Sequence, residues 1–129
     1  MVSPAVPNPA PGFRQVPRSH IVTRPAGRRV QVTLNGEVLA DSRNAIEMRE
    51  GAYAPVYYLP REDVRMARLE RSDHATHCPF KGDATHYSLA GGPQDVAWSY
   101  ERPYDEMQDI RGHLAFYAKR VDAISVSND

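Results

Sequence analysis

Alternation of apolar and polar residues predicts short β-strands along most of the chain. In the stretch RRVQVTLNGEVLADS (residues 28–42), Val30, Val32 and Leu34 alternate with polar residues, which is the period of a strand with one buried face. The Asn-Gly dipeptide that follows favours a type I′ turn, because both of its residues tolerate positive φ. The pattern therefore predicts a β-hairpin here.

Further strands are expected in the middle and in the last third of the chain. The stretches NAIEMRE and APVYYLP carry apolar and aromatic residues at strand spacing, and Pro60 ends the second of them. DATHYSLA and VAWSYE flank the turn GGPQD and predict a second hairpin, in which Trp98 and Tyr100 lie on the same face because they are two residues apart. The first half of HLAFYAKRVDAI also favours a strand, since Leu114 and Phe116 alternate with other residues.

Helical patterns are confined to two short pieces. PREDVRMARLERS begins with proline and acidic residues and places Val64, Met66 and Leu69 within about two helical turns, which suits a short helix. PYDEMQDIRGH predicts a turn and a short helical segment. Several short strands, one or two short helices and no βαβ alternation indicate a small, mainly β domain with antiparallel strands, α+β at most.

Proline dominates the beginning of the chain. Because proline lacks an amide donor and fixes φ, neither a helix nor a central strand is expected in residues 1–27. We predict an extended or disordered arm there, followed by a single domain over residues 28–126. Phe13 and Ile21 are the residues that could anchor the arm, if it packs over the domain or over a partner subunit; the second case would make the protein a homodimer.

Composition narrows the function classes. The 129 residues suffice for one hydrophobic core, and the sixteen Lys and Arg balance the sixteen Asp and Glu, so no net field favours nucleic acid. A single cysteine cannot form an internal disulfide. No run approaches the roughly 20 apolar residues that span a bilayer, and the first residues lack the pattern of a secretory signal. We expect a cytoplasmic protein without a nucleic-acid or membrane partner.

Several motifs occur in an order that resembles a known family. The series GEVLADS, YYLPREDV, THCPFKGDATHYS, AWSYERP and HLAFYAKRVDAI, within residues 30–124, resembles the bacterial and fungal family called domain of unknown function 427. The resemblance implies a β-tent, in which two antiparallel sheets meet at an angle, similar in outline to methionine sulfoxide reductase B and to the drug-binding domain of cereblon.

The resemblance implies no particular chemistry. Zinc often holds the tent of those relatives through two Cys-x-x-Cys pairs, which are absent here, so we expect side-chain packing to hold the core without a metal or other cofactor. A nucleotidyltransferase activity is sometimes attached to the family, but this chain has no Gly-Ser segment followed by two aspartates at alternate positions.

The stretch THCPFKGDATHYS holds most of the candidate catalytic residues. Cys78 would act as a nucleophile only if a nearby cation or base lowered the pKa of its thiol, and a small buried cysteine that merely packs is the alternative. Lys81 could orient an anion or a carbonyl, or simply belong to a tight turn whose glycine has positive φ. Glu50, at a strand end, could be a general base if buried, or an exposed charge. The possible zinc ligands form a loose set, and we expect no metal site: Asp73, His74, His77, Cys78 and His86.

Aromatic residues on the expected strands suggest a ligand-binding cleft. We favour a small-molecule binding domain whose cleft is lined by Trp98, Tyr100 and Tyr58, with the polar residues Lys81, Glu50 and His77 contributing at its rim. If the cleft is similar to that of cereblon, its ligand is cyclic or planar. The alternatives are a small enzyme that uses Cys78 or Glu50 together with Lys81 in the same cleft, and a structural or protein-interaction module.

Overall fold

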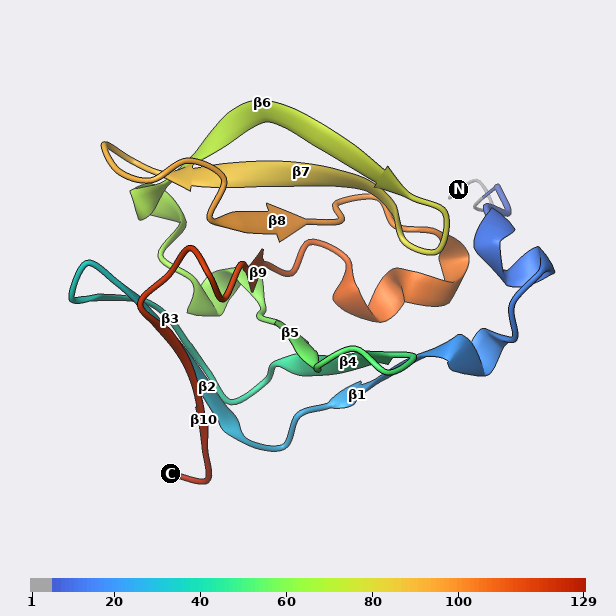
Figure 1. Ribbon diagram of the computed structural model, residues 1–129, viewed down its shortest axis with the longest axis horizontal. Coiled ribbons are helices and arrows are strands. Elements are labelled where there is room, and N and C mark those ends of the chain that lie inside the picture. The colour runs from blue at the N-terminus through green and yellow to red at the C-terminus, as the bar shows by residue number, and fades with distance from the viewer. Residues whose placement is uncertain (1–5) are drawn as a thin grey trace, which may run out of the picture.

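The computed structural model describes residues 6–129 and shows three small antiparallel β-sheets (Figure 1). The first sheet has the order β1-β4-β5, with bounds Ile21–Pro25, Ile46–Glu50 and Val56–Tyr58. The second has the order β10-β2-β3, with bounds Ala123–Ser127, Arg29–Leu34 and Glu37–Ser42. The third has the order β6-β7-β8-β9, with bounds Leu69–Cys78, Gly82–Leu89, Ala97–Ser99 and Ala115–Phe116. The prediction of a mainly β, antiparallel domain is confirmed, with the strands divided among three sheets where two were expected.

Short bridges connect the sheets. In Figure 1 the third sheet lies above the first, and the second sheet closes the left side. Leu59, directly after β5, and Leu114, directly before β9, exchange two backbone hydrogen bonds of 2.8 Å each. Ala40 of β3 pairs in the same antiparallel way with Val64. Backbone pairing therefore joins the first sheet to the third, and it joins the second sheet to the segment that leads into β6.

Both predicted hairpins are present. Asn35 and Gly36 connect β2 to β3 with φ values of 53° and 77°, as a type I′ turn requires. β7 and β8 pair antiparallel, with Trp98 opposite His86. Trp98 and Tyr100 both contact Tyr58, which confirms that they lie on the same face.

The predicted helix in residues 60–72 is replaced by two single 3₁₀ turns and a strand. These are η3 (Arg61–Asp63) and η4 (Met66–Arg68), and Leu69 then begins β6. Val64 between them is extended, with φ −114° and ψ 138°, because its backbone pairs with Ala40 while its side chain packs in the core. Tertiary pairing thus overrides a helix-like spacing of apolar residues. The second expected helical piece is the 3₁₀ segment η5 (Asp105–Ile110).

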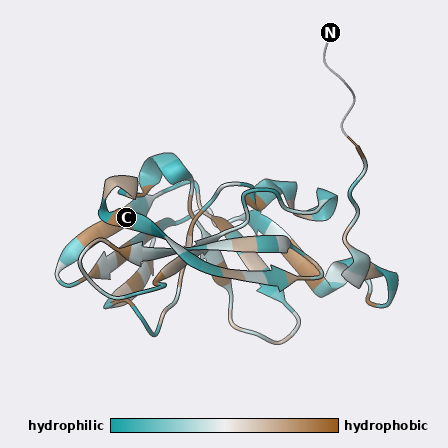
Figure 2. Ribbon diagram, turned by 90° about the horizontal axis from the view of Figure 1, so that it is seen from above, coloured by the Kyte–Doolittle hydropathy of each residue, from teal (hydrophilic) through white to brown (hydrophobic). Residues whose placement is uncertain are grey.

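Two hydrophobic clusters fill the interior. The first packs β2 and β3 against the third sheet and includes Val32, Leu39 and Leu114. The second packs β1, β4 and β5 against the third sheet and η5, and includes Met48, Tyr58 and Met107. Figure 2 shows hydrophobic and hydrophilic residues interspersed along the strands. No helix within residues 6–129 is long and apolar enough to cross a bilayer.

Part of the segment predicted as an arm belongs to a sheet. β1 pairs with β4 over its whole length, and the Ile21 side chain is fully buried in the second cluster. This pairing is compatible with the proline-rich sequence because β1 is an edge strand that ends at Pro25. Before it lie two 3₁₀ turns, η1 (Pro11–Arg14) and η2 (Arg18–His20). Residues 1–5 are outside the described part of the chain, and the prediction of an arm there stays a prediction.

Candidate functional site

Three of the aromatic residues selected from the sequence contact one another. The Trp98 Nε1 donates a hydrogen bond of 3.3 Å to the Tyr58 hydroxyl, and the two rings are perpendicular at a centroid distance of 6.2 Å. The Tyr100 ring lies 6.5 Å from the Tyr58 ring between centroids. Burial raises the pKa of the Tyr58 and Tyr100 hydroxyls further above their usual range, so both stay neutral. Tyr58 and Tyr100 belong to the core, whereas Trp98 is only half-buried.

The exposed part of Trp98 lines a groove of about 380 Å³ where the three sheets meet. Its walls come from β5, from β8 and β9 with the turn that follows, and from β10. Side chains at the margins of both hydrophobic clusters line it together with Tyr117, among them Val56, Tyr57, Trp98, Ile124 and Val126. The groove is therefore a gap between two cores and is lined mostly by apolar groups.

Few polar groups border the groove. The Tyr117 ring lies 4.4 Å from Trp98, and the guanidinium of Arg120 lies 4.5 Å from the centre of the Tyr117 ring. Burial raises the pKa of Tyr117 against the opposing effect of Arg120. The Tyr57 hydroxyl donates to Glu47 at 3.4 Å. Among the hydrogen bonds of the described residues, none involves the Tyr117 hydroxyl.

Lys81 and Glu50 lie close together, but away from the groove. The Lys81 Nζ is 2.7 Å from Glu50 Oε1, and His20 Nε2 is 4.0 Å from Glu50 Oε2. His77 is exposed and bonds to Asp83 at 2.7 Å. Of the six residues predicted to bind a ligand, only Trp98 lines the groove. Lys81 and Glu50 satisfy each other as an ion pair.

Cys78 lies at the start of a tight turn, as the sequence indicated. The Lys81 amide donates to the Cys78 carbonyl at 3.2 Å, and Gly82 follows with φ 117°. A Cβ on Gly82 would lie 3.3 Å from the Arg102 carbonyl oxygen, so this position favours glycine. The half-buried thiol packs against the second cluster. In the described part of the chain His77 bonds to Asp83 and Tyr104, and no histidine is hydrogen-bonded to Cys78.

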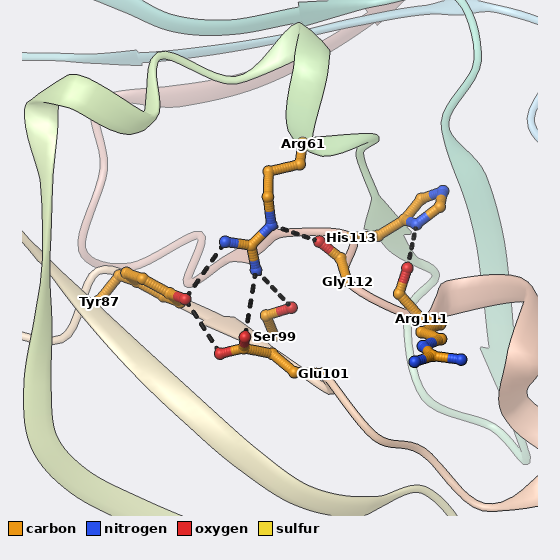
Figure 3. Close-up of polar contacts among 7 residues, drawn as sticks. All are labelled: Arg61, Tyr87, Ser99, Glu101, Arg111, Gly112 and His113. Atoms are coloured by element: carbon orange, nitrogen blue, oxygen red, sulfur yellow. Dashed lines mark hydrogen bonds and ion pairs between the residues drawn. The ribbon is translucent and has the colours of Figure 1, made fainter.

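A second polar cluster lies on the opposite face of β8 (Figure 3). The guanidinium of Arg61 donates to the Tyr87 hydroxyl at 3.3 Å, to Ser99 Oγ at 3.4 Å and to the Gly112 carbonyl at 3.1 Å. The Tyr87 hydroxyl in turn donates to Glu101 at 3.1 Å. Because Ser99 and Tyr87 are buried and their bonds are satisfied, this cluster clamps β7, β8 and the segment before β9 together.

Comparison with known families agrees with the resemblance of the motifs. The family model described as domain of unknown function (DUF427) matches residues 22–127, most of the chain. The chain belongs to the DUF427 family. No curated protein shows a significant sequence match to it. The match begins within β1, so this DUF427 domain includes residues that the sequence pattern assigned to an arm.

Two histidines of the DUF427 domain stack next to Tyr117. Between Arg71 and Ala75, β6 has more residues than the stretch of β7 that it faces, which forms a β-bulge. His74 lies in this bulge, and its ring centroid is 4.5 Å from that of His86. His86 is buried, is hydrogen-bonded to Thr76 at 3.2 Å, and stacks parallel to Tyr117 at 6.2 Å. Within residues 6–129, no group of three or more His, Cys, Asp or Glu side chains is arranged to hold a metal ion.

Acidification is expected to destabilise the DUF427 domain through His86. Burial, with a smaller contribution from His74, lowers the pKa of His86 below its ordinary value of 6.5. Below that value the unfolded chain binds a proton that the folded chain does not, so the free energy of unfolding falls as the pH falls towards the folded-state pKa. At pH values above the ordinary pKa of histidine, the contribution of His86 to the free energy of unfolding is present in full. Denaturant titrations from about pH 7 down to about pH 5 should show this slope.

The variant His86→Phe tests this origin of the slope. It retains a ring between His74 and Tyr117 but cannot titrate, so its stability is expected to vary less with pH than that of the wild type. An equal slope in wild type and variant would contradict the assignment to His86.

Proposed function

We propose that this DUF427 domain binds a small planar organic molecule in the groove beside Trp98. The groove of about 380 Å³, lined by aromatic and aliphatic side chains, is the observation that carries this proposal. Ligand sites for small molecules fall in this size range and are mostly apolar, with a few polar groups that orient the ligand. Trp98, Tyr57 and Tyr117 offer ring surfaces on which a planar ligand could stack.

Trp98 is held in place before any ligand binds. Its indole N–H is satisfied by Tyr58, which is itself fixed in the second cluster by contact with Tyr100. Its ring also lies against Tyr117. A ligand would therefore stack on a surface that does not have to be ordered on binding, which limits the entropic cost.

The polar border of the groove favours a ligand that carries a hydrogen-bond acceptor. The Tyr117 hydroxyl can donate, and the guanidinium of Arg120 adds a positive charge over the Tyr117 ring. The Tyr57 hydroxyl already donates to Glu47. Hydrogen bonds from Arg49 and Arg24 lower the pKa of Glu47, although burial acts in the opposite direction, so Glu47 stays charged. A planar molecule with a carbonyl or carboxylate group fits this arrangement best.

Binding is expected to depend on Trp98. Because Trp98 is the only tryptophan of the chain, its emission reports directly on the groove, and a panel of aromatic carboxylates and neutral heterocycles can be screened by its saturable change. Ligands found in this way are expected to bind Trp98→Leu about fivefold more weakly in calorimetry, since stacking on an aromatic ring contributes on the order of 1 kcal/mol beyond buried area.

Tyr53→Ala is the matched control, since Tyr53 is 77% exposed and does not line the groove. It should leave the affinity unchanged. If Trp98→Leu remains folded and binds every ligand of the panel as tightly as the wild type does, the groove is not the binding site and the proposal fails.

A further inference from the structure

In residues 7–13 every second residue from Pro7 to Pro11 is a proline, and this segment packs on the domain. The backbone amides of the residues between and after the prolines, Asn8, Ala10 and Gly12, all donate hydrogen bonds to the domain. Pro7, Pro9 and Pro11 have no amide to donate. The intervening amides of Asn8 and Ala10 donate to the carboxylates of Asp105 and Glu106 at 2.8 Å each. The Gly12 amide donates to the Pro79 carbonyl at 3.0 Å, and the Asp105 amide donates back to the Asn8 carbonyl at 3.0 Å.

The surface that receives this segment consists of Pro79 and Phe80 at the tip of the β6–β7 hairpin and of Asp105 and Glu106 in η5. We call these four residues the seat. Figure 1 shows the N-terminal segment beside the right-hand ends of β6 and β7 and beside the segment that contains η5. The contacts to η5 join residues 96 or 97 positions apart in the sequence.

The seat also restricts which side chains the docked segment can carry. Ala10 is only 3% exposed, so this position favours a small residue. A Cβ on Gly12 would lie 2.6 Å from the Phe80 ring, a distance that real contacts do not allow. Phe13 packs edge-on against Phe80 with a centroid distance of 5.0 Å. The seat therefore fits the pattern Pro-x-Pro-small-Pro-Gly-aromatic.

The docking follows the physics of proline-rich peptide recognition. Ala10 has φ −70° and ψ 123°, close to a polyproline conformation, which prolines adopt before binding and at a low entropic cost. Residues 6–18 carry Arg14 and Arg18 and no acidic residue, whereas the seat contributes two carboxylates. Segment and seat are thus complementary in hydrogen bonds, shape and charge.

We propose that the seat is a peptide-binding site in its own right, and that it takes residues 7–13 of a second copy of the chain, so that two copies exchange these segments. Every contact described above is made with the hairpin tip or with η5, and none depends on the covalent connection through residues 14–17. That linker of four residues spans up to about 13 Å when extended. Exchange of an identical element re-forms the same contacts between copies, which makes it a low-cost route to a dimer.

Two full-length variants that complement each other test whether the segment of one copy docks on the seat of another, which is the step that exchange requires. Gly12→Val disables the segment through the contact with Phe80 but leaves the seat intact. Asp105→Ala/Glu106→Ala removes two acceptors of the seat but leaves the segment intact. Neither chain can then bind its own segment. In the wild type, that tethered segment competes with the segment of another copy at an effective concentration of about 1 mM, and the two variants remove this competition. An equimolar mixture, with one chain labelled with ¹⁵N, is expected to give a heterodimer in native mass spectrometry, and each variant alone is expected to stay monomeric.

A labelled peptide of residues 6–14 provides the second measurement. It should bind the Gly12→Val chain and bind the Asp105→Ala/Glu106→Ala chain at least tenfold more weakly. Val6→Ala, at a position 85% exposed, is the neutral control for handling and labelling. The proposal is overturned if both variants are folded by circular dichroism and their mixture stays monomeric, or if Gly12→Val alone dimerises as readily as the mixture.

Discussion

Tyr58→Ala is expected to lower the free energy of unfolding by about 3 to 5 kcal/mol, because a large aromatic side chain would leave a cavity in the second hydrophobic cluster. Tyr58 is 1% exposed and contacts both Trp98 and Tyr100. Its loss also frees the indole N–H of Trp98. Urea denaturation measures the stability, and the emission of the single tryptophan should shift to longer wavelength as water reaches its ring.

Tyr58→Phe separates the two effects of that substitution. It keeps the ring and removes only the hydroxyl that accepts from Trp98, so a loss of about 1 kcal/mol is expected. Tyr53→Ala, at an exposed position, should stay within about 0.5 kcal/mol of the wild type. If Tyr58→Ala behaved like Tyr53→Ala, Tyr58 would not hold Trp98 in place, and the preorganisation of the groove would need another cause.

Local patterns predicted the hairpins because their geometry is set within a few residues. Asn35-Gly36 specifies a turn whatever surrounds it, and the two-residue spacing of Trp98 and Tyr100 puts them on one face of any strand. The error at Leu69 has the opposite origin. Its spacing of three residues from Met66 fits a helix, and only the pairing of Val64 with Ala40 and of β6 with β7 makes this stretch extended.

The groove could be predicted only in part. An aromatic surface that included Trp98 followed from the sequence, but adjacent residues of β5 face different clusters: Tyr58 is in the second, and Tyr57 borders the first and lines the groove. When both faces of a strand pack against hydrophobic clusters, the alternation of residues does not show which face also borders a groove. Tyr117 was missed because it follows directly after the end of β9, where strand periodicity no longer applies.

Ile21→Ala is expected to cost about 2 to 5 kcal/mol, although proline-rich sequence surrounds β1. The Ile21 side chain is fully buried in the second cluster, and its backbone pairs with Glu50 at the end of β4. Proline correctly excluded a helix and a central strand here, but it does not exclude an edge strand that ends at Pro25. Thermal and urea denaturation of the full chain would measure the loss.

Val22→Ala is the matched control, because Val22 is the next residue of the same strand and is 49% exposed on its other face. It should cost less than about 1 kcal/mol, since little of its surface leaves water on folding. Equal, small effects of the two substitutions would mean that β1 contributes nothing to the core and that the arm extends to residue 27. A large difference would instead tie β1 to the core, and with it the end of β4, where Glu50 holds Lys81.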